Sequence, residues 1–129
     1  MNNNEYLKNV LDELAAHKQK YEILCGKESK LAGNVREYET DIKLSEAEMF
    51  MNLEIEGKNQ VYVNGARRYV LSNAESRNAA RRVHTADLIR KLAVAQADLD
   101  GVRIDKKEIL DRVTILKIII KNIEIQVSI

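Results

Sequence analysis

The side chains most often used in catalysis or metal binding are few in this sequence and are not grouped. The chain has two histidines, His17 and His84, and one cysteine among its 129 residues. Asp87 lies one helical turn after His84, but no third ligand follows at the spacing that zinc sites require. Gly57 and Gly65 stand alone, so there is no glycine-rich loop that would bind phosphate. We therefore expect no catalytic residue, metal, cofactor or small-molecule substrate, and predict a non-enzymatic binding protein.

Basic side chains are concentrated in the middle of the sequence. The segment from Gly57 to Lys91 contains eight lysines and arginines but only two acids. The whole chain has 21 basic and 20 acidic residues, so the rest of it is acidic. Arginine makes forked contacts with phosphate or carboxylate, and tyrosines among bases can stack on unpaired nucleobases. The predicted nucleic-acid or partner-binding residues are Lys58, Tyr62, Arg67, Arg68, Tyr69, Arg77, Arg81, Arg82, Arg90 and Lys91.

The sequence leaves three uses of this basic segment open. Arg77 and Arg81 are four residues apart and would share one face of a helix, with Arg82 at its edge. Such a face suits nucleic acid or a nucleoprotein, and it also suits an acidic protein surface. A solvated basic tip without a ligand is the third alternative.

Isoleucines accumulate near the C-terminal end beyond what one helical seam needs. If this region is helical, isoleucines off the seam form a second apolar stripe. If it is not, the alternation from Ile123 to Ile129 would suit a strand. Exposed apolar surplus usually marks an interface, so we expect a homo-oligomer. The predicted oligomer interface is Ile115, Ile118, Ile119, Ile125 and Ile129.

The elements that position these residues follow from heptad spacing. Seven-residue steps from Leu7 to Met49 and from Val10 to Asn52 give ten apolar or tyrosine positions out of fourteen. A second series from Leu88 to Val127 has eleven apolar positions out of twelve. The sequence therefore predicts one domain over residues 1–129. It has a helix at about 4–54, a head at about 55–72, a helix at about 73–122 and a tail, 123–129, that is helix or strand.

The predicted fold class is all-α: a long antiparallel two-helix coiled-coil hairpin with a small β-hairpin or loop as its head. Antiparallel pairing would bring Glu28 and Lys106, the only acid and the only lysine of the two seams, within about one layer. Asn64-Gly65 is a frequent two-residue hairpin turn. Ser72 with Glu75 fits a capping box at the start of the second helix.

Part of the sequence resembles small phage and mobile-element proteins. The resemblance rests on Gly57-Lys58, Tyr69, the run from Ser72 to Glu75, Arg77 and Ala79, and covers roughly residues 40–125. Members of that family have two heptad helices joined by a Gly-Lys…Tyr-Ser-Asn-x-x-x-Arg-x-Ala segment. The stretch Asn59–Leu71 is longer here, with Val70-Leu71 between tyrosine and serine. The resemblance implies the hairpin and a phage context near recombination and replication genes, without a mechanism.

We therefore predict a phage-type protein whose basic head contacts nucleic acid or a host nucleoprotein, as an accessory in recombination or replication. An inhibitor of host defence of the anti-CRISPR type, bound to a host effector protein, is the first alternative. A purely structural coiled-coil rod is the second. No stretch approaches the ~20 apolar residues of a membrane-spanning helix, so we expect no membrane contact. The N-terminal residues do not resemble a signal peptide, so we expect the cytoplasm, that of the host cell if phage-encoded.

Overall fold

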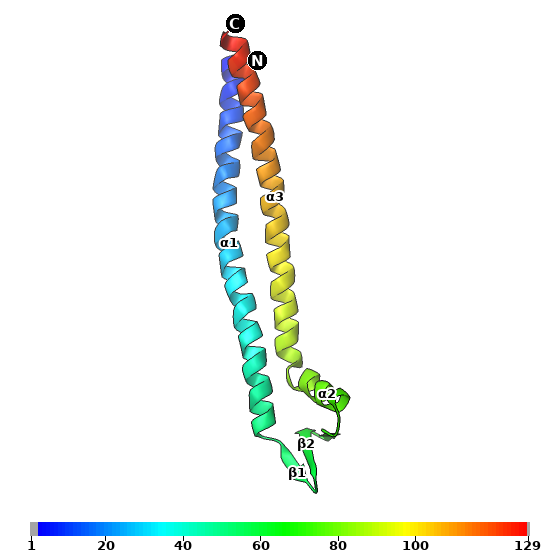
Figure 1. Cartoon of the computed structure of the whole chain (residues 1–129). Helices are drawn as coiled ribbons and strands as arrows, with labels where there is room; N and C mark the ends of the chain where they lie inside the picture. Colours follow the sequence, from blue (N-terminus) through cyan, green and yellow to red (C-terminus); the bar gives the residue numbers. More distant parts are fainter. Residues whose placement is uncertain (1–2, 129) are drawn as a thin grey trace. The chain divides into compact units, whose positions relative to one another are not determined.

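The chain divides into two units. The computed structural model describes residues 3–128, with side chains as far as residue 126. The first unit, here the terminal unit, joins Met1–Ala32 to Ala97–Ile129. The second, here the head unit, is Gly33–Gln96. Helices account for most of the described residues, and a small antiparallel sheet lies in the head unit (Figure 1).

Two long helices each contribute to both units, α1 (Asn3–Met51) and α3 (Ala86–Ser128). The chain has no proline, so no residue interrupts their backbone hydrogen bonds. Gly26 and Gly33 lie inside α1 without ending it, as predicted from the unbroken heptad count. No described helix has an apolar stretch sufficient to cross a membrane.

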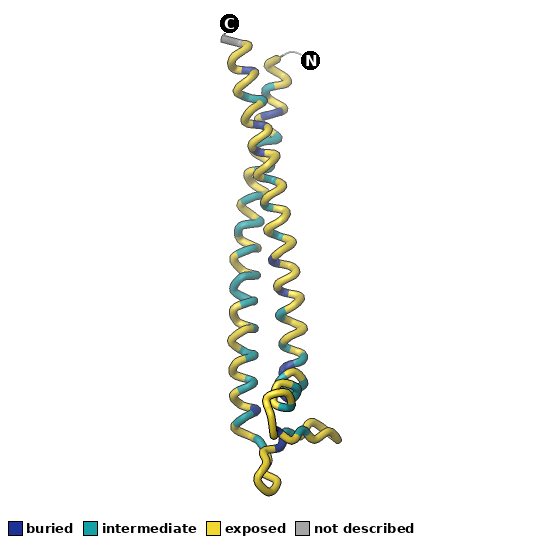
Figure 2. The backbone as a smooth tube through the Cα atoms, turned by 45° about the vertical axis from the view of Figure 1, so that its right-hand side comes forward, coloured by how far each residue is buried: buried dark blue, intermediate teal, exposed yellow. Residues whose placement is uncertain are grey.

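The predicted seams are the faces that the helices bury. Every predicted seam position of α3 from Leu88 to Ile123 is buried or half-buried, whereas most other positions are exposed (Figure 2). The corresponding positions of α1 from Leu7 to Met49 behave in the same way. Asn52 is exposed because α1 has ended at Met51. The fully buried seam residues of the terminal unit are Val10, Leu99, Val113, Leu116 and Ile123.

In the terminal unit, the two helices pack side by side in opposite directions (Figures 1 and 2). The Lys106 ammonium donates to Glu28 Oε2 at 3.4 Å and lies 5.1 Å from the centre of the Tyr21 ring. The antiparallel pairing predicted for these two charged seam residues is therefore confirmed. Both side chains are half-buried, so the pair is partly shielded from water.

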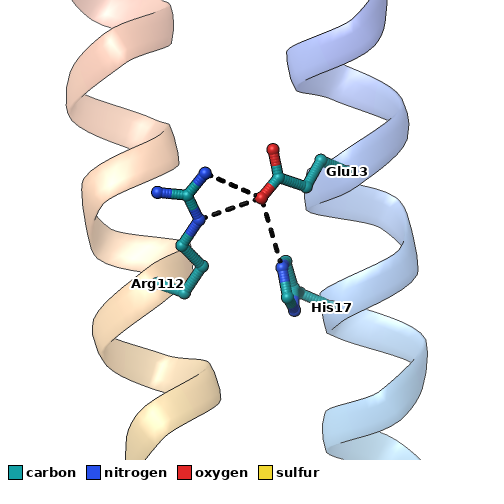
Figure 3. A network of polar contacts seen from close by, with 3 residues as sticks. All are labelled: Glu13, His17 and Arg112. Atoms are coloured by element: carbon teal, nitrogen blue, oxygen red, sulfur yellow. Dashed lines mark hydrogen bonds and ion pairs between the residues drawn. The ribbon is translucent and has the colours of Figure 1, made fainter.

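A second polar network links the helices of the terminal unit nearer the chain ends (Figure 3). Glu13 Oε1 accepts hydrogen bonds from Arg112 Nε at 2.9 Å and Nη2 at 2.8 Å, and His17 Nε2 lies 3.4 Å away. The forked contact from Arg112 lowers the pKa of the Glu13 carboxyl below its usual 4.5, mainly through the hydrogen bond. The ionised form of Glu13 is therefore favoured by folding.

This network predicts a pH dependence of stability. Because folding lowers the pKa of Glu13, its stabilising contribution is fully present above pH 4.5 and is lost as the pH falls through the lower folded value. In Glu13→Gln this increment is absent, so the difference in unfolding free energy from wild type should shrink in acid. Urea titrations between about pH 7 and pH 3 measure it. Glu22→Gln, exposed on the same helix and without an ion pair to a described residue, should show no such convergence.

The head contains three strands rather than a two-stranded hairpin: β1 (Glu54–Glu56), β2 (Asn59–Asn64) and β3 (Arg67–Val70). They form one antiparallel sheet in the order β1-β2-β3. Each connection has a glycine with positive φ at its first position, 63° at Gly57 and 62° at Gly65. This matches the two-residue turns that fit the twist of a hairpin. The second turn is Gly65-Ala66, one residue later than predicted, and Glu54 belongs to β1 rather than to the first helix.

The predicted second helix is in fact two helices, α2 (Ala74–His84) and α3. Thr85 separates them and is 1% exposed. Its hydroxyl donates to the carbonyl of Arg81 at 2.7 Å, and its own carbonyl accepts from the amide of Ile89 at 2.9 Å. The threonine thus caps both helices, and α2 departs from the direction of α3 (Figure 1). At the other end, residues 123–128 continue α3, so the strand alternative is wrong for them.

A small apolar cluster holds the head unit together. Met49 from the end of α1, Leu71 after β3 and Ala80 from α2 are all buried. Phe50, Leu53 and two tyrosines of the sheet pack around them. The cluster therefore fixes the sheet and α2 against the last turn of α1.

Candidate binding surface of the head unit

The arginines of α2 are positioned by a capped helix start. Asn73 Oδ1 accepts from the amide of Ser76 at 2.8 Å, and the amide of Asn73 donates to Ser76 Oγ at 3.3 Å. The capping box was predicted one residue too early, at Ser72 with Glu75. Arg77 follows directly and is exposed, and Arg82 is exposed near the other end of α2. A stable helix start fixes the direction in which Arg77 leaves the backbone.

Arg68 is engaged within the sheet. Its Nη2 lies 2.7 Å from Glu56 Oε2 and 3.8 Å from Glu54 Oε2, so the side chain reaches from β3 across β2 to β1. The hydrogen bond to Glu56 raises the pKa of the Arg68 guanidinium. Much of the Arg68 charge is therefore neutralised by β1, whose glutamates lie just before the basic segment of the sequence.

Arg81 and Arg90 are also engaged. The Arg81 guanidinium carbon lies 4.9 Å from the centre of the Phe50 ring, and its Nη1 donates to Asn78 Oδ1 at 3.1 Å. Its Nε is buried without a hydrogen-bond partner among the described residues. Arg90 forms an ion pair with Asp87 one turn earlier. Arg81 thus belongs to the packing between α1 and α2, and Arg90 is partly neutralised.

Five predicted contact residues remain exposed and form no ion pair with any residue in the described part of the chain. They come from several elements of the head unit: the first turn of the sheet, the start of β3, both ends of α2, and the first part of α3. A base without an acidic neighbour keeps its full charge for an external anion. These residues are Lys58, Arg67, Arg77, Arg82 and Lys91.

The two tyrosines of the sheet are half-buried direct partners across β2 and β3. Their ring centres are 5.9 Å apart. The Tyr62 hydroxyl lies 2.9 Å from His84 Nδ1, and the His84 ring meets it edge-on. Burial, and secondarily Tyr69, raises the pKa of the Tyr62 phenol. The phenol is therefore neutral, and Tyr62 joins the sheet to α2 instead of standing free for stacking.

A cavity of about 350 Å³ lies beside Tyr62 and His84. Its polar lining includes Glu48 and Asn52 of α1 and Glu54 of β1. It contains no lysine or arginine, so it is separate from the basic surface. Within residues 3–128 no histidine, cysteine or carboxylate cluster is arranged to hold a metal ion.

The predicted interface isoleucines have different surroundings in the terminal unit. Ile115, Ile118 and Ile125 are 48%, 56% and 51% exposed. Ile119 is half-buried at the edge of the seam. Ile129 lies outside the described residues. Helical continuation through Ser128 puts the exposed isoleucines on a face of α3 that the seam does not use.

Comparison with known proteins adds no relative: no family model, curated protein or solved structure matches the chain.

Proposed function

We propose that this chain is a non-enzymatic nucleic-acid-binding protein that uses the exposed bases of the head unit. The observation that carries the proposal is that Lys58, Arg67, Arg77, Arg82 and Lys91 are exposed and have no ion-pair partner among the described residues. Phosphate contacts by such side chains provide affinity without sequence selectivity. The role as an accessory in phage recombination or replication rests on the sequence resemblance alone.

The proposal predicts binding with a steep salt dependence. Labelled single-stranded and double-stranded oligonucleotides should bind in fluorescence anisotropy titrations. With four or five phosphate contacts, affinity should fall by roughly two orders of magnitude between about 50 and 200 mM salt. Weak binding that salt does not change would contradict phosphate recognition.

A pull-down from lysate with and without nuclease separates the proposal from the inhibitor alternative. Loss of captured material on nuclease treatment supports nucleic acid as the ligand. A single protein that stays bound after nuclease would instead indicate a protein-directed role for the same bases. Comparing the two samples at low and high salt shows whether either contact is electrostatic.

We propose further that α1 and α3 form one continuous antiparallel coiled-coil hairpin. The unbroken heptad spacing of both helices and the Glu28–Lys106 pair support it. Glu28→Leu should change the free energy of unfolding by less than about 1 kcal/mol, because a half-buried ion pair contributes little net stability. It should loosen the register or the oligomeric state, as seen by gel filtration and chemical cross-linking.

The exposed Glu22→Leu is the matched control for this prediction, since Glu22 lies off the seam. If Glu28→Leu behaves like that control in both measurements, the charged pair does not set the register.

A further inference from the structure

The α3 helix carries a second apolar stripe in the terminal unit. Ile104, Ile115, Ile118 and Ile125 are 59%, 48%, 56% and 51% exposed. Ile104, Ile118 and Ile125 fall on one heptad position that also includes Asp111, and Ile115 falls on the position three residues before it. Ile104 extends the stripe two heptads towards the N-terminal end of α3, beyond the isoleucines expected from the sequence. The stripe therefore has the spacing of a coiled-coil seam.

This stripe faces away from α1. Each helical residue turns the side chain by about 100°, so Ile118 points about 160° away from Leu116, which is fully buried against the seam. One neighbouring helix cannot cover both faces. A second helix with matching spacing is the partner that such a stripe fits.

We propose that the stripe binds a second copy of this chain, with the two α3 helices antiparallel about a two-fold axis. In the register that centres the stripe, Ile115 of each copy faces Ile118 of the other. Asp111 then faces Asn122, so a carboxylate meets an amide that can donate to it. In an isologous contact each of these pairs occurs twice.

Charge selects the antiparallel arrangement. A parallel in-register pair would place Asp111 against Asp111 and Glu108 against Glu108, and all four of these carboxylates are exposed side chains of the same face. Like charges held opposite each other oppose association. The antiparallel register separates them, and no acid of the stripe faces an acid. The stripe is thus complementary to itself in one direction only. This inference deepens the self-association expected of the isoleucines and is independent of the basic head.

Sedimentation equilibrium tests the surface. Ile118→Asp places a carboxylate twice in the two-fold contact and should raise the dimer dissociation constant by about a hundredfold or more. Ile23→Asp is the matched control, because Ile23 is 55% exposed on α1 of the same unit and should leave the constant unchanged. Circular dichroism checks that both variants keep their helix content. A wild-type chain that stays monomeric at its highest soluble concentration overturns the proposal.

Disulfide cross-linking tests the direction, with Cys25→Ser as the shared background. Asp111→Cys and Asn122→Cys chains should cross-link when mixed but not when oxidised alone, because identical positions would lie about 16 Å apart along the axis. Efficient cross-linking of either variant alone shows a parallel pair and overturns the antiparallel arrangement. Nucleic-acid affinity measured on Ile118→Asp stays at the wild-type value per chain if the head acts independently, so the two proposals fail separately.

Discussion

Arg77→Glu combined with Arg82→Glu is expected to weaken nucleic-acid binding by a hundredfold or more near 0.1 M salt. The double variant removes two phosphate contacts and adds two repulsive charges. The slope of log affinity against log salt should also become shallower by about 1.5 to 2, since each lost contact releases fewer counterions. Anisotropy titrations over a salt series measure both quantities. Arg82 is chosen over Arg81 because Arg81 packs on Phe50, and its replacement would disturb the fold.

Lys27→Glu with Lys30→Glu is the matched control for this variant. Both lysines are exposed on α1 in the terminal unit, and the change in net charge is the same. The control should keep most of the affinity if the head provides the phosphate contacts. An equal loss in both variants would mean that net charge alone drives association. No loss in either variant would favour the structural rod.

Met49→Ala is expected to lower the free energy of unfolding by about 2 to 4 kcal/mol, because it opens a cavity in a cluster that cannot collapse easily. Met49 is 3% exposed and packs with Leu71 and Ala80, which come from two other parts of the head unit. Met51→Ala, two residues on at 83% exposure, should change stability by less than about 0.5 kcal/mol. Urea unfolding monitored by circular dichroism measures both.

Hydrogen exchange locates the effect of Met49→Ala. Amides of β2 and α2 should lose protection, because the cluster joins these elements to the end of α1. Equal destabilisation by the two methionine variants would show that the cluster does not hold the head unit together.

The helices were predictable because their signal is repeated many times. An apolar residue at every third or fourth position over six heptads leaves little choice of buried face, and the structure buries those positions from Leu7 to Ile123. The break at Thr85 was not predictable in this way. No glycine or proline marks it, and its cause is a buried hydroxyl that bonds to the carbonyl of Arg81.

The head and its bases were predictable only in part. Gly57-Lys58 and the alternation Glu54-Ile55-Glu56 are signals for β1, but the helical pattern before them extends to the same residues. The residues that neutralise bases were missed because they lie outside the basic segment. Glu56 meets Arg68 only once three strands are in register, and Phe50 meets Arg81 only once α2 packs on α1.

The position of Arg68 also bears on the solubility of the sheet. Both β1 and β3 are edge strands, and an open edge can template pairing with another chain. Glutamates on β1 and arginines on β3 would attract each other between molecules and promote the stacking of sheets end to end. Because Arg68 reaches across β2 to Glu56 and Glu54, these opposite charges are satisfied within one molecule. The ion pair thereby protects the head unit against aggregation through its strands.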